Sequence, residues 1–435
     1  MSLWWDQVNR PIFMPEDLDQ SWDVIIVGGG FSGLWTAHHL NLIDATLKIA
    51  ILEKGQVGSG ASGRNGGWVS ALYPMADAKL HKFFSQSKID ELHAHLSISI
   101  DDIGTFAKLE SIDIGFNKGG SLVVARNHGQ LTRLRGERIR DARLLDKEET
   151  KARIGMKGAV GSRYSADCAT INPAALVVGL AKSLEKRGVS IFENTFADIT
   201  KRNRVHARGK ELKTAFLVRA VEAYYEKTRE QIPIYSLMIA TEPLPSTVFD
   251  DIGIQNREAF AEGSHLVTYA QRTPDNRLAI GGRGAPYTWG SRRNEANENL
   301  AKGHQRLRAM ASKWFPVLNE YEFTHAWGGA VAVTRDWAPY VRMDNSYGEL
   351  GGYAGDGLTL SYLAAGAMAD LITDRKSTRS TLPFVQWRNP RWESEPLRWI
   401  AVNAAIKLSG VADKEERITR RPSVIMKTLS PITGQ

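Results

Sequence analysis

The 435-residue chain is 43% hydrophobic and 24% charged, a composition typical of globular proteins that excludes a collagen, a disulfide scaffold or a largely disordered chain. Its net charge of +8 is small for this length, and the basic stretches lack the aromatic platform that single-stranded bases stack on, so we expect no nucleic-acid partner. The single cysteine, Cys168, leaves no intramolecular disulfide and favours a reducing compartment.

The termini and the hydropathy pattern predict a cytoplasmic protein. Residues 1–20 contain acidic residues and two tryptophans, but no basic region followed by an apolar one, which argues against a signal peptide. No stretch approaches the roughly 18 uninterrupted apolar residues that a membrane span needs. One alternative stays open, because the basic C-terminal tail contains an amphipathic helix that could touch a membrane surface.

The first strong elements form a βαβ unit. Residues 23–27 are a short β-branched run that predicts a buried parallel strand, a helical pattern covers residues 34–40, and residues 47–52 predict a second strand that ends at Glu53. A glycine-rich turn, residues 28–33, joins the first strand to the helix.

This turn has the pattern Gly-x-Gly-x-x-Gly and is followed by an acidic residue 20 positions beyond its last glycine. Gly28 permits the tight turn, Gly30 lets a pyrophosphate approach the backbone, and Gly33 lets helix and strand pack closely. The helix N-terminus favours phosphate, and Glu53 would hold ribose hydroxyls. The pattern predicts a dinucleotide site; a ligand-free turn is the disfavoured alternative.

A second stretch of small residues, 58–68, follows Glu53 directly. Its exposed N–H groups and Arg64 suit a cofactor whose far half lies deep in the same domain, an element that an NAD site does not need. The alternative is a flexible solvent loop, but Trp68 and Val69 continue into apolar sequence and argue against it.

Later elements complete the pattern. Asn172 and Pro173 predict the start of a helix over residues 174–186, followed by a strand at 189–192. Residues 236–280 alternate strand-like runs with turn signals and predict an antiparallel sheet. A last glycine-rich stretch, residues 351–357, opens a predicted helix over 358–372, and an amphipathic helix is expected over about 396–408.

Taken together, these motifs resemble the FAD-dependent D-amino-acid oxidase family, which includes glycine and sarcosine oxidases. The resemblance rests on both glycine-rich segments, on Asn172-Pro173, on Pro233-Ile234-Tyr235-Ser236 and on Gly-Tyr-x-Gly-x-Gly before the last helix. Residues 61–68 and 239–245 are most similar to the γ-glutamylputrescine oxidase-like branch. The resemblance covers about residues 21–374.

The resemblance implies non-covalent FAD and a role for each matching position. The first glycine turn would hold the pyrophosphate, and Glu53 and Lys54 would hold the adenosine. The second glycine-rich loop would run along the pyrophosphate and ribityl chain to the ring. The last glycine loop would hold the pyrimidine end of the flavin, where a helix N-terminus stabilises negative charge. The cofactor-binding residues so implied are Gly28, Gly30, Phe31, Ser32, Gly33, Glu53, Lys54, Gly60, Ala61, Ser62, Arg64, Asn65, Gly66, Gly67, Trp68, Phe196, Ala197, Gly355, Asp356, Gly357, Leu358 and Thr359.

Three departures from the family pattern bear on the chemistry. Asp356 stands where many relatives have histidine, and a carboxylate there would oppose flavin reduction unless it caps the helix, the role that we predict. Residues 327–334 lack the arginine that amino-acid-specific relatives use to bind a carboxylate, which disfavours a free α-amino acid. Residues 277–282 lack the lysine of sarcosine-oxidase-like members, so the reactivity with oxygen stays open.

The expected substrate-site residues are Tyr269, Arg283 and Trp327. Tyr269 lies on the strand that supplies a substrate-facing tyrosine in relatives, and Arg283 could bind an acidic substrate tail; an ordinary sheet tyrosine and an exposed structural arginine are equally good alternatives. Trp327 and Trp68 would wall the pocket, although core packing alone explains both. No histidine has neighbours at metal-ligand spacing, so we expect no metal site.

The predicted fold is an α/β chain in which a Rossmann-like FAD-binding domain of glutathione-reductase type is interleaved with an α+β substrate domain built on an antiparallel sheet. The FAD domain would comprise residues 1–75, 146–232 and 325–376, and the substrate domain residues 76–145 and 233–324. Residues 377–435 would pack on the FAD domain through Trp387, Trp392 and Trp399.

The activity expected from the resemblance is oxidation of a primary or secondary amine to an imine, with oxygen or another electron acceptor as oxidant. The alternatives are a peripheral membrane dehydrogenase that passes electrons to a quinone and a non-catalytic flavin-binding subunit.

Overall fold

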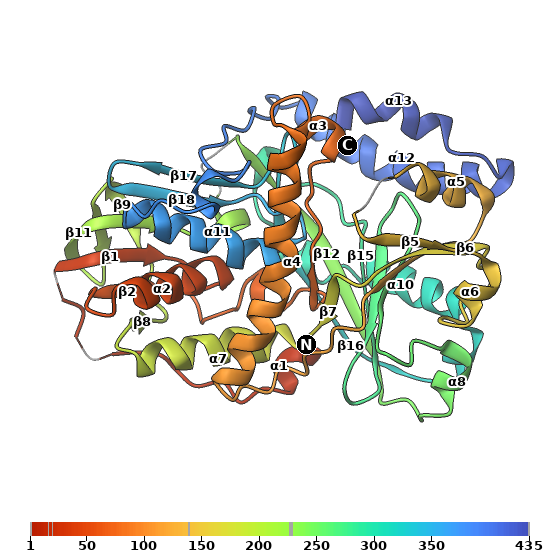
Figure 1. Ribbon diagram of the computed structural model, residues 1–435, viewed down its shortest axis with the longest axis horizontal. Helices are drawn as coiled ribbons and strands as arrows, with labels where there is room; N and C mark the ends of the chain where they lie inside the picture. Colours follow the sequence, from red (N-terminus) through yellow and green to blue (C-terminus); the bar gives the residue numbers. More distant parts are fainter. Residues whose placement is uncertain (1, 16, 20, 138–139, 226–228, 434–435) are drawn as a thin grey trace.

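The computed structural model describes residues 2–15, 17–19, 21–137, 140–225 and 229–433. Its strands gather into two large sheets that stand side by side (Figure 1). The first sheet carries the predicted glycine turn, and the second is the predicted antiparallel sheet. The α/β fold with an interleaved antiparallel part is therefore confirmed.

Eight strands form the first sheet in the described part of the chain, in the order β17-β18-β11-β1-β2-β8 with β10 and β9 added beside β11. β1 pairs in parallel with both β2 and β11, the arrangement of a doubly wound sheet. Residues 24–27 of β1 are buried throughout, as an unbroken β-branched run requires in a central parallel strand. The strands are β1 Ser21–Val27, β2 Ile49–Leu52, β8 Ser190–Phe192, β9 Asp198–Lys201, β10 Arg204–Ala207, β11 Lys210–Arg219, β17 Tyr340–Asp344 and β18 Tyr347–Gly351.

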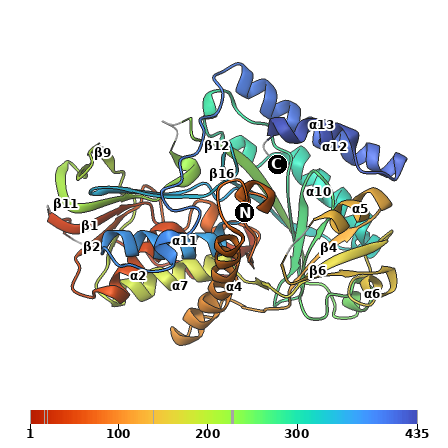
Figure 2. The ribbon, with the colours of Figure 1, turned by 45° about the horizontal axis from the view of Figure 1, so that its top comes forward.

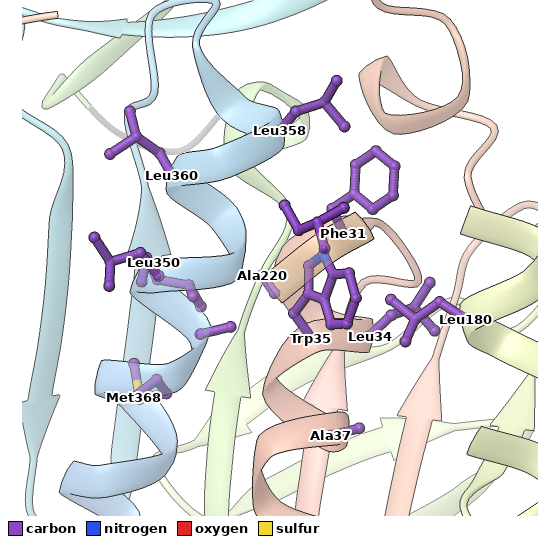
Figure 3. Close-up of a cluster of buried hydrophobic side chains, with 14 of the residues drawn as sticks. Phe31, Leu34, Trp35, Ala37, Leu180, Ala220, Leu350, Leu358, Leu360 and Met368 are labelled. Atoms are coloured by element: carbon purple, nitrogen blue, oxygen red, sulfur yellow. The ribbon is translucent and has the colours of Figure 1, made fainter. Parts of the chain in front are cut away.

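Helices α2 (Phe31–Ile43), α7 (Pro173–Lys186), α11 (Gly357–Ile372) and α4 (Gln86–Leu109) share the hydrophobic core of the first sheet. Side chains of α2 and α11 interdigitate there, with Trp35 at the centre (Figure 3). Asn172 caps α7 as predicted, accepting hydrogen bonds from Ala174 N and Ala175 N.

Within the described residues, eight strands also form the second sheet, in the order β16-β12-β15-β14-β13-β4-β6-β5. Its pairs are antiparallel except β4 with β13. The strands are β4 Ser121–Ala125, β5 Ala142–Leu145, β6 Gly161–Ser165, β12 Gln231–Thr241, β13 Ala259–Glu262, β14 Thr268–Arg272, β15 Leu278–Arg283 and β16 Phe323–Thr334; β3 Trp68–Ser70 and β7 Cys168–Thr170 pair separately. Its helices are α5 His128–Gly136, α6 Lys147–Lys151, α8 Val248–Ile252, α9 Glu295–Glu298 and α10 Ala301–Trp314; α1 Leu3–Asp6 and α3 Asp77–Leu80 are short.

The division into domains stays a prediction, but three elements join the sheet or core of the other predicted domain. β6 and β16 fall in ranges assigned to the FAD domain, and both belong to the second sheet. Helix α4 falls in a range assigned to the substrate domain, yet Ile89, Leu96 and Ile103 are buried in the core of the first sheet. β16 pairs with the distant β12, whereas β6 pairs with the nearby β4 and β5, and local sequence patterns do not show which sheet a strand joins.

The C-terminal segment contains α12 (Leu397–Thr419) and α13 (Val424–Thr433). Trp387 packs against Phe84 beside the first core, with ring centroids 5.9 Å apart. The indole N–H of Trp392 donates to Val333 O of β16, which lies in a range assigned to the FAD domain, and Trp399 is 42% exposed. Packing of the tail on the FAD domain stays a prediction. Helix α12 lies beside α5, over the second sheet (Figures 1 and 2). No helix among the described residues has the length and apolarity to cross a membrane.

Candidate active site

One cavity of about 1230 Å³ runs from the carboxyl ends of the first sheet's parallel strands to the second sheet. It exceeds the roughly 300–1,000 Å³ of most small-ligand sites, so a dinucleotide and a substrate can share it. Of the predicted site residues, those that line it are Gly28, Gly30, Phe31, Ser32, Glu53, Lys54, Gly60, Ala61, Ser62, Arg64, Asn65, Gly66, Trp68, Phe196, Ala197, Tyr269, Arg283, Gly355, Asp356, Gly357 and Leu358. Gly33, Gly67, Thr359 and Trp327 lie behind its wall.

The glycine turn after β1 has no room for side chains. Gly28 has φ +115°, and a Cβ there would lie 2.5 Å from Ala220 O of the neighbouring chain segment. A Cβ on Gly33 would lie 2.0 Å from Gly28 O, so only glycine lets α2 pack this closely on the turn. The N-terminus of α2 therefore opens directly into the cavity, where it favours phosphate.

Ser62 links the two predicted glycine-rich segments, because Phe31 N of α2 donates to Ser62 Oγ over 2.9 Å. Glu53, at the end of β2, accepts hydrogen bonds from Gly29 N (2.7 Å) and Gly55 N (2.8 Å). Burial raises the pKa of Glu53 above its usual value, with these two N–H groups opposing the shift. Through these two hydrogen bonds, Glu53 also holds the glycine-rich turn in place.

The far end of the cavity suits an adenine ring. Lys54 Nζ lies 5.8 Å from the ring centroid of Phe196, whose side chain is 61% exposed. Ala197 lines the cavity beside them.

Arg64 lines the cavity and is also paired within the protein, so its contact with the cofactor stays a prediction. Its guanidinium donates to Glu298 Oε2 (2.7 Å), Tyr224 Oη (3.0 Å) and Gly60 O (3.1 Å). Glu298 belongs to α9, so Arg64 ties the second glycine loop to the helices of the second sheet. Sequence spacing could not predict this ion pair, which joins residues 234 positions apart.

Two buried donor groups test whether a cofactor fits. The indole N–H of Trp68 and the hydroxyl of Thr359 are buried without a hydrogen-bond partner in the described structure. Trp68 lines the cavity, and Thr359 lies in the first turn of α11. Thr359 lies behind the cavity wall, so of these two residues only Trp68 can face a cavity ligand. The fit to FAD rests on the glycine turn, where a Cβ at Gly28 or Gly33 would meet backbone atoms, and on a cavity large enough for a dinucleotide.

Asp356 occupies the N-cap position of α11, but it makes no capping hydrogen bond, so the predicted capping role is wrong. Asp356 lines the cavity, and its carboxyl group is close enough to Arg283 and Tyr269 to act electrostatically on both. Burial raises the pKa of Asp356 to about 6, and the nearby positive charge of Arg283 opposes the rise. The cavity therefore holds a carboxyl group whose charge changes just below neutral pH.

Tyr269 and Arg283 come from adjacent strands of the second sheet. Tyr269 Oη lies 3.0 Å from Ser236 Oγ, and its ring packs edge-on against Trp68 with centroids 5.7 Å apart. Arg283 donates to Ala354 O (2.7 Å), and no carboxylate of the described residues lies within 4.0 Å of its guanidinium. Burial lowers the pKa of Arg283. Both residues lie where the second sheet meets the cavity, here called its substrate end, and their contact with substrate stays a prediction.

Trp327 does not belong to this site. It is 3% exposed, donates from its indole N–H to Arg64 O (2.9 Å), and packs edge-on against Trp4. Core packing explains it, as the alternative stated above anticipated. Cys168 is likewise buried away from the cavity, and burial raises the pKa of its thiol.

Glu222 is the main cavity residue that the sequence did not reveal. It follows β11, and its carboxylate accepts hydrogen bonds from Tyr353 N (3.2 Å) and Ala332 N (3.4 Å). Glu222 thereby connects the last glycine loop to β16. Recognising β11 as a central parallel strand would have given the signal, because acids at the carboxyl ends of such strands face ligand sites.

Replacing Glu222 by glutamine should make stability less sensitive to pH. Burial raises the pKa of Glu222 from 4.5 to about 7, so the folded chain binds the proton more tightly than the unfolded chain, and wild-type stability falls as pH rises from about 4.5 to 7. Glutamine does not titrate, so we expect the variant to gain about 1–2 kcal/mol relative to wild type between pH 5 and 8, after allowing for partial exposure. Urea unfolding at pH 5 and pH 8 measures the free energy of unfolding, with the exposed Glu148→Gln as control. An equal change in this free energy between the two pH values for wild type and E222Q would contradict the prediction.

Comparison with known proteins agrees with this geometry. Residues 23–371 match the family model described as FAD dependent oxidoreductase. The chain is 26% identical over 367 residues to γ-glutamylputrescine oxidoreductase of Escherichia coli, covering 80% of this chain and 83% of the relative. It is 26% identical over 397 residues to the probable oxidoreductase OrdL of Haemophilus influenzae, covering 85% and 88%.

Among solved structures, glycine oxidase from Geobacillus kaustophilus superposes with a TM-score of 0.68 at 22% identity, covering 85% of this chain and 99% of that one. L-Proline dehydrogenase from P. horikoshii gives 0.68 at 19% identity, covering 84% and 96%. These likenesses show a shared fold. The family match spans most of the chain and confirms the resemblance predicted from the glycine-rich segments: this protein belongs to the FAD-dependent oxidoreductases, and its cofactor is FAD.

Proposed function

We propose that the chain oxidises a primary or secondary amine, of polyamine or alkylamine type, to an imine that water then hydrolyses. The observation that carries the proposal is Asp356, an acidic residue that lines the cavity, acts electrostatically on Arg283 and Tyr269, and has no capping role. FAD supplies the acceptor for the hydride equivalent that leaves the carbon next to nitrogen, while the N–H proton goes to solvent.

The residues of the chain then bind and orient the amine. Asp356 pairs with a second, non-reacting ammonium group of the substrate, since the reacting nitrogen has to be neutral to form the imine. Tyr269 and Ser236 offer hydroxyl groups to the same cavity. Val123, Ala261 and Val267 line the same end and exclude water from the reacting carbon. A negative Asp356 also disfavours electron uptake by a flavin ring nearby, so its pairing with a cation serves both binding and reaction.

Two observations support an amine over an α-amino acid. Residues 327–334, which form the end of β16, contain no arginine. Arg335, the next candidate, is paired with Glu393 (Nε to Oε1, 3.0 Å) and does not line the cavity. The relative named γ-glutamylputrescine oxidoreductase points the same way.

A second candidate function rests on Arg283. Its buried guanidinium reaches the cavity and has no carboxylate of the described residues within 4.0 Å, so it can bind a substrate carboxylate. This carboxylate could be the acidic tail of an acylated amine or the carboxylate of an amino acid.

The flavin is held without a covalent bond in this proposal, because Cys168 is buried outside the cavity and residues 58–70 contain no histidine. Acid precipitation should therefore release the yellow cofactor into the supernatant. The oxidant is oxygen or another electron acceptor. A quinone-linked enzyme at a membrane surface and a non-catalytic flavin subunit are the alternatives.

Anaerobic titration of the purified holoprotein with putrescine, spermidine, their N-acetyl forms, glycine, sarcosine and D-alanine tests the proposal. Bleaching of the visible flavin band by the amines but not by the amino acids is the expected result. Bleaching by amino acids alone would favour Arg283 as a carboxylate-binding residue. A bound flavin that none of them bleaches would support the non-catalytic alternative, and activity in pelleted membranes that salt removes would support the quinone-linked one.

A further inference from the structure

The C-terminal helix α12 reaches the substrate end of the cavity through a single loop. The family match ends at residue 371, so α12, which begins at Leu397, lies outside it. Its path beside α5 brings its last turns over the loop of residues 263–267, which joins β13 to β14.

Two carboxylates of α12 hold this loop. Asp413 accepts hydrogen bonds from the backbone N–H groups of His265 (2.7 Å) and Leu266 (3.1 Å). One turn later, Glu416 is completely buried, accepts from Arg133 Nε (2.8 Å), and lies 3.0 Å from His265 Nε2. Hydrogen bonds to charged groups are the stronger class, so the loop has little freedom while α12 is in place.

The far end of the loop forms part of the cavity wall. The side chain of Val267 lines the cavity, and Val267 O accepts a hydrogen bond from Arg283 N (3.1 Å). Arg306 of α10 completes the connection, because it donates to Arg283 O and to Thr268 Oγ1. Asp413 also acts electrostatically on Arg306. A displacement of the loop therefore moves both Val267 and the backbone that carries Arg283.

We propose that Asp413 is a positioning residue for the substrate end of the cavity, so that α12 sets substrate affinity without touching the substrate. The proposal concerns the shape of the cavity and holds for either candidate substrate class. It predicts an effect on the half-saturating concentration, because Val267 of the loop lines the cavity together with Tyr269 and Arg283.

Asp413→Ala should raise the half-saturating amine concentration for anaerobic flavin reduction about tenfold, with the limiting rate within about twofold of wild type. Asp413→Asn should recover part of the loss, since its amide oxygen accepts one of the two N–H groups. Glu415→Ala is the matched control: Glu415 holds the start of α13 through Ser423 and Val424 N (3.1 Å), and it has no contact with the loop. Flavin content and thermal midpoint establish that each variant is folded.

Hydrogen–deuterium exchange gives a readout that does not depend on turnover. Faster exchange at residues 265–266 and at the Arg283 amide is expected in Asp413→Ala and not in Glu415→Ala. Unchanged exchange at Arg283, or an equal change in half-saturation for both variants, would overturn the proposal. If no amine bleaches the flavin, the proposed function fails, and exchange at Arg283 alone decides whether Asp413 positions the cavity.

Discussion

Replacing Gly33 by alanine should yield a folded chain without its yellow cofactor. The added Cβ would lie 2.0 Å from Gly28 O, a backbone atom that cannot swing aside. Relief requires α2 to move away from the turn, at a cost of about 1–3 kcal/mol of stability. That movement also displaces the helix N-terminus that faces the pyrophosphate. We expect FAD affinity to fall at least 100-fold, which is about 2.7 kcal/mol.

The ratio of flavin to protein absorption after purification, followed by titration with added FAD, measures this loss. Gly410→Ala is the matched control, because no atom lies within 4 Å of a Cβ added there, in the middle of α12. That variant should keep full flavin and gain about 0.5–1 kcal/mol, since alanine favours helix more than glycine does. Full flavin in Gly33→Ala would contradict the role assigned to the turn.

The cofactor half of the fold was predictable because its signals are local. The turn at residues 28–33, the strand before it and the acid at Glu53 lie within one βαβ unit, and physical requirements fix each position. Asn172 and the start of α11 were predictable for the same reason. The strands β6 and β16 fall in ranges predicted for the FAD domain, because no local pattern shows that β6 pairs with β4 and β5 or that β16 pairs with the distant β12.

Local sequence patterns are also insufficient for individual residues of the site. Position along the chain placed Asp356 at a helix start, but the absence of a capping hydrogen bond, the cavity and the nearby charge of Arg283 appear only in the structure. The sequence predicts Arg64 as a cofactor ligand, but its pairing with Glu298 could not be predicted from the sequence. No motif marks Glu222, because the strand before it, β11, begins and ends with polar residues and resembles an exposed hairpin strand rather than a central parallel one.

Asp356→Asn should lower kcat/KM for an amine substrate about 30-fold or more at pH 8, because truncating a buried charge partner typically costs at least about 2 kcal/mol. The loss should appear in the half-saturating concentration, since the change removes the pairing with the ammonium group. The limiting rate of flavin reduction should hold or rise, because a neutral residue no longer opposes electron uptake by the flavin. Stopped-flow reduction under anaerobic conditions separates these two quantities.

The pH dependence identifies Asp356 as the group responsible. Its pKa is raised to about 6, so wild type loses the negative charge as pH falls through 6, and the ratio of wild-type to variant kcat/KM should fall towards one below pH 5. Titration of the amine itself cancels in this ratio. Asp374→Asn, which follows the other end of α11, is the matched control and should give a ratio near one throughout. A ratio below one at pH 8 would instead show that Asp356 competes with the substrate for Arg283, and the substrate group held there would be a carboxylate.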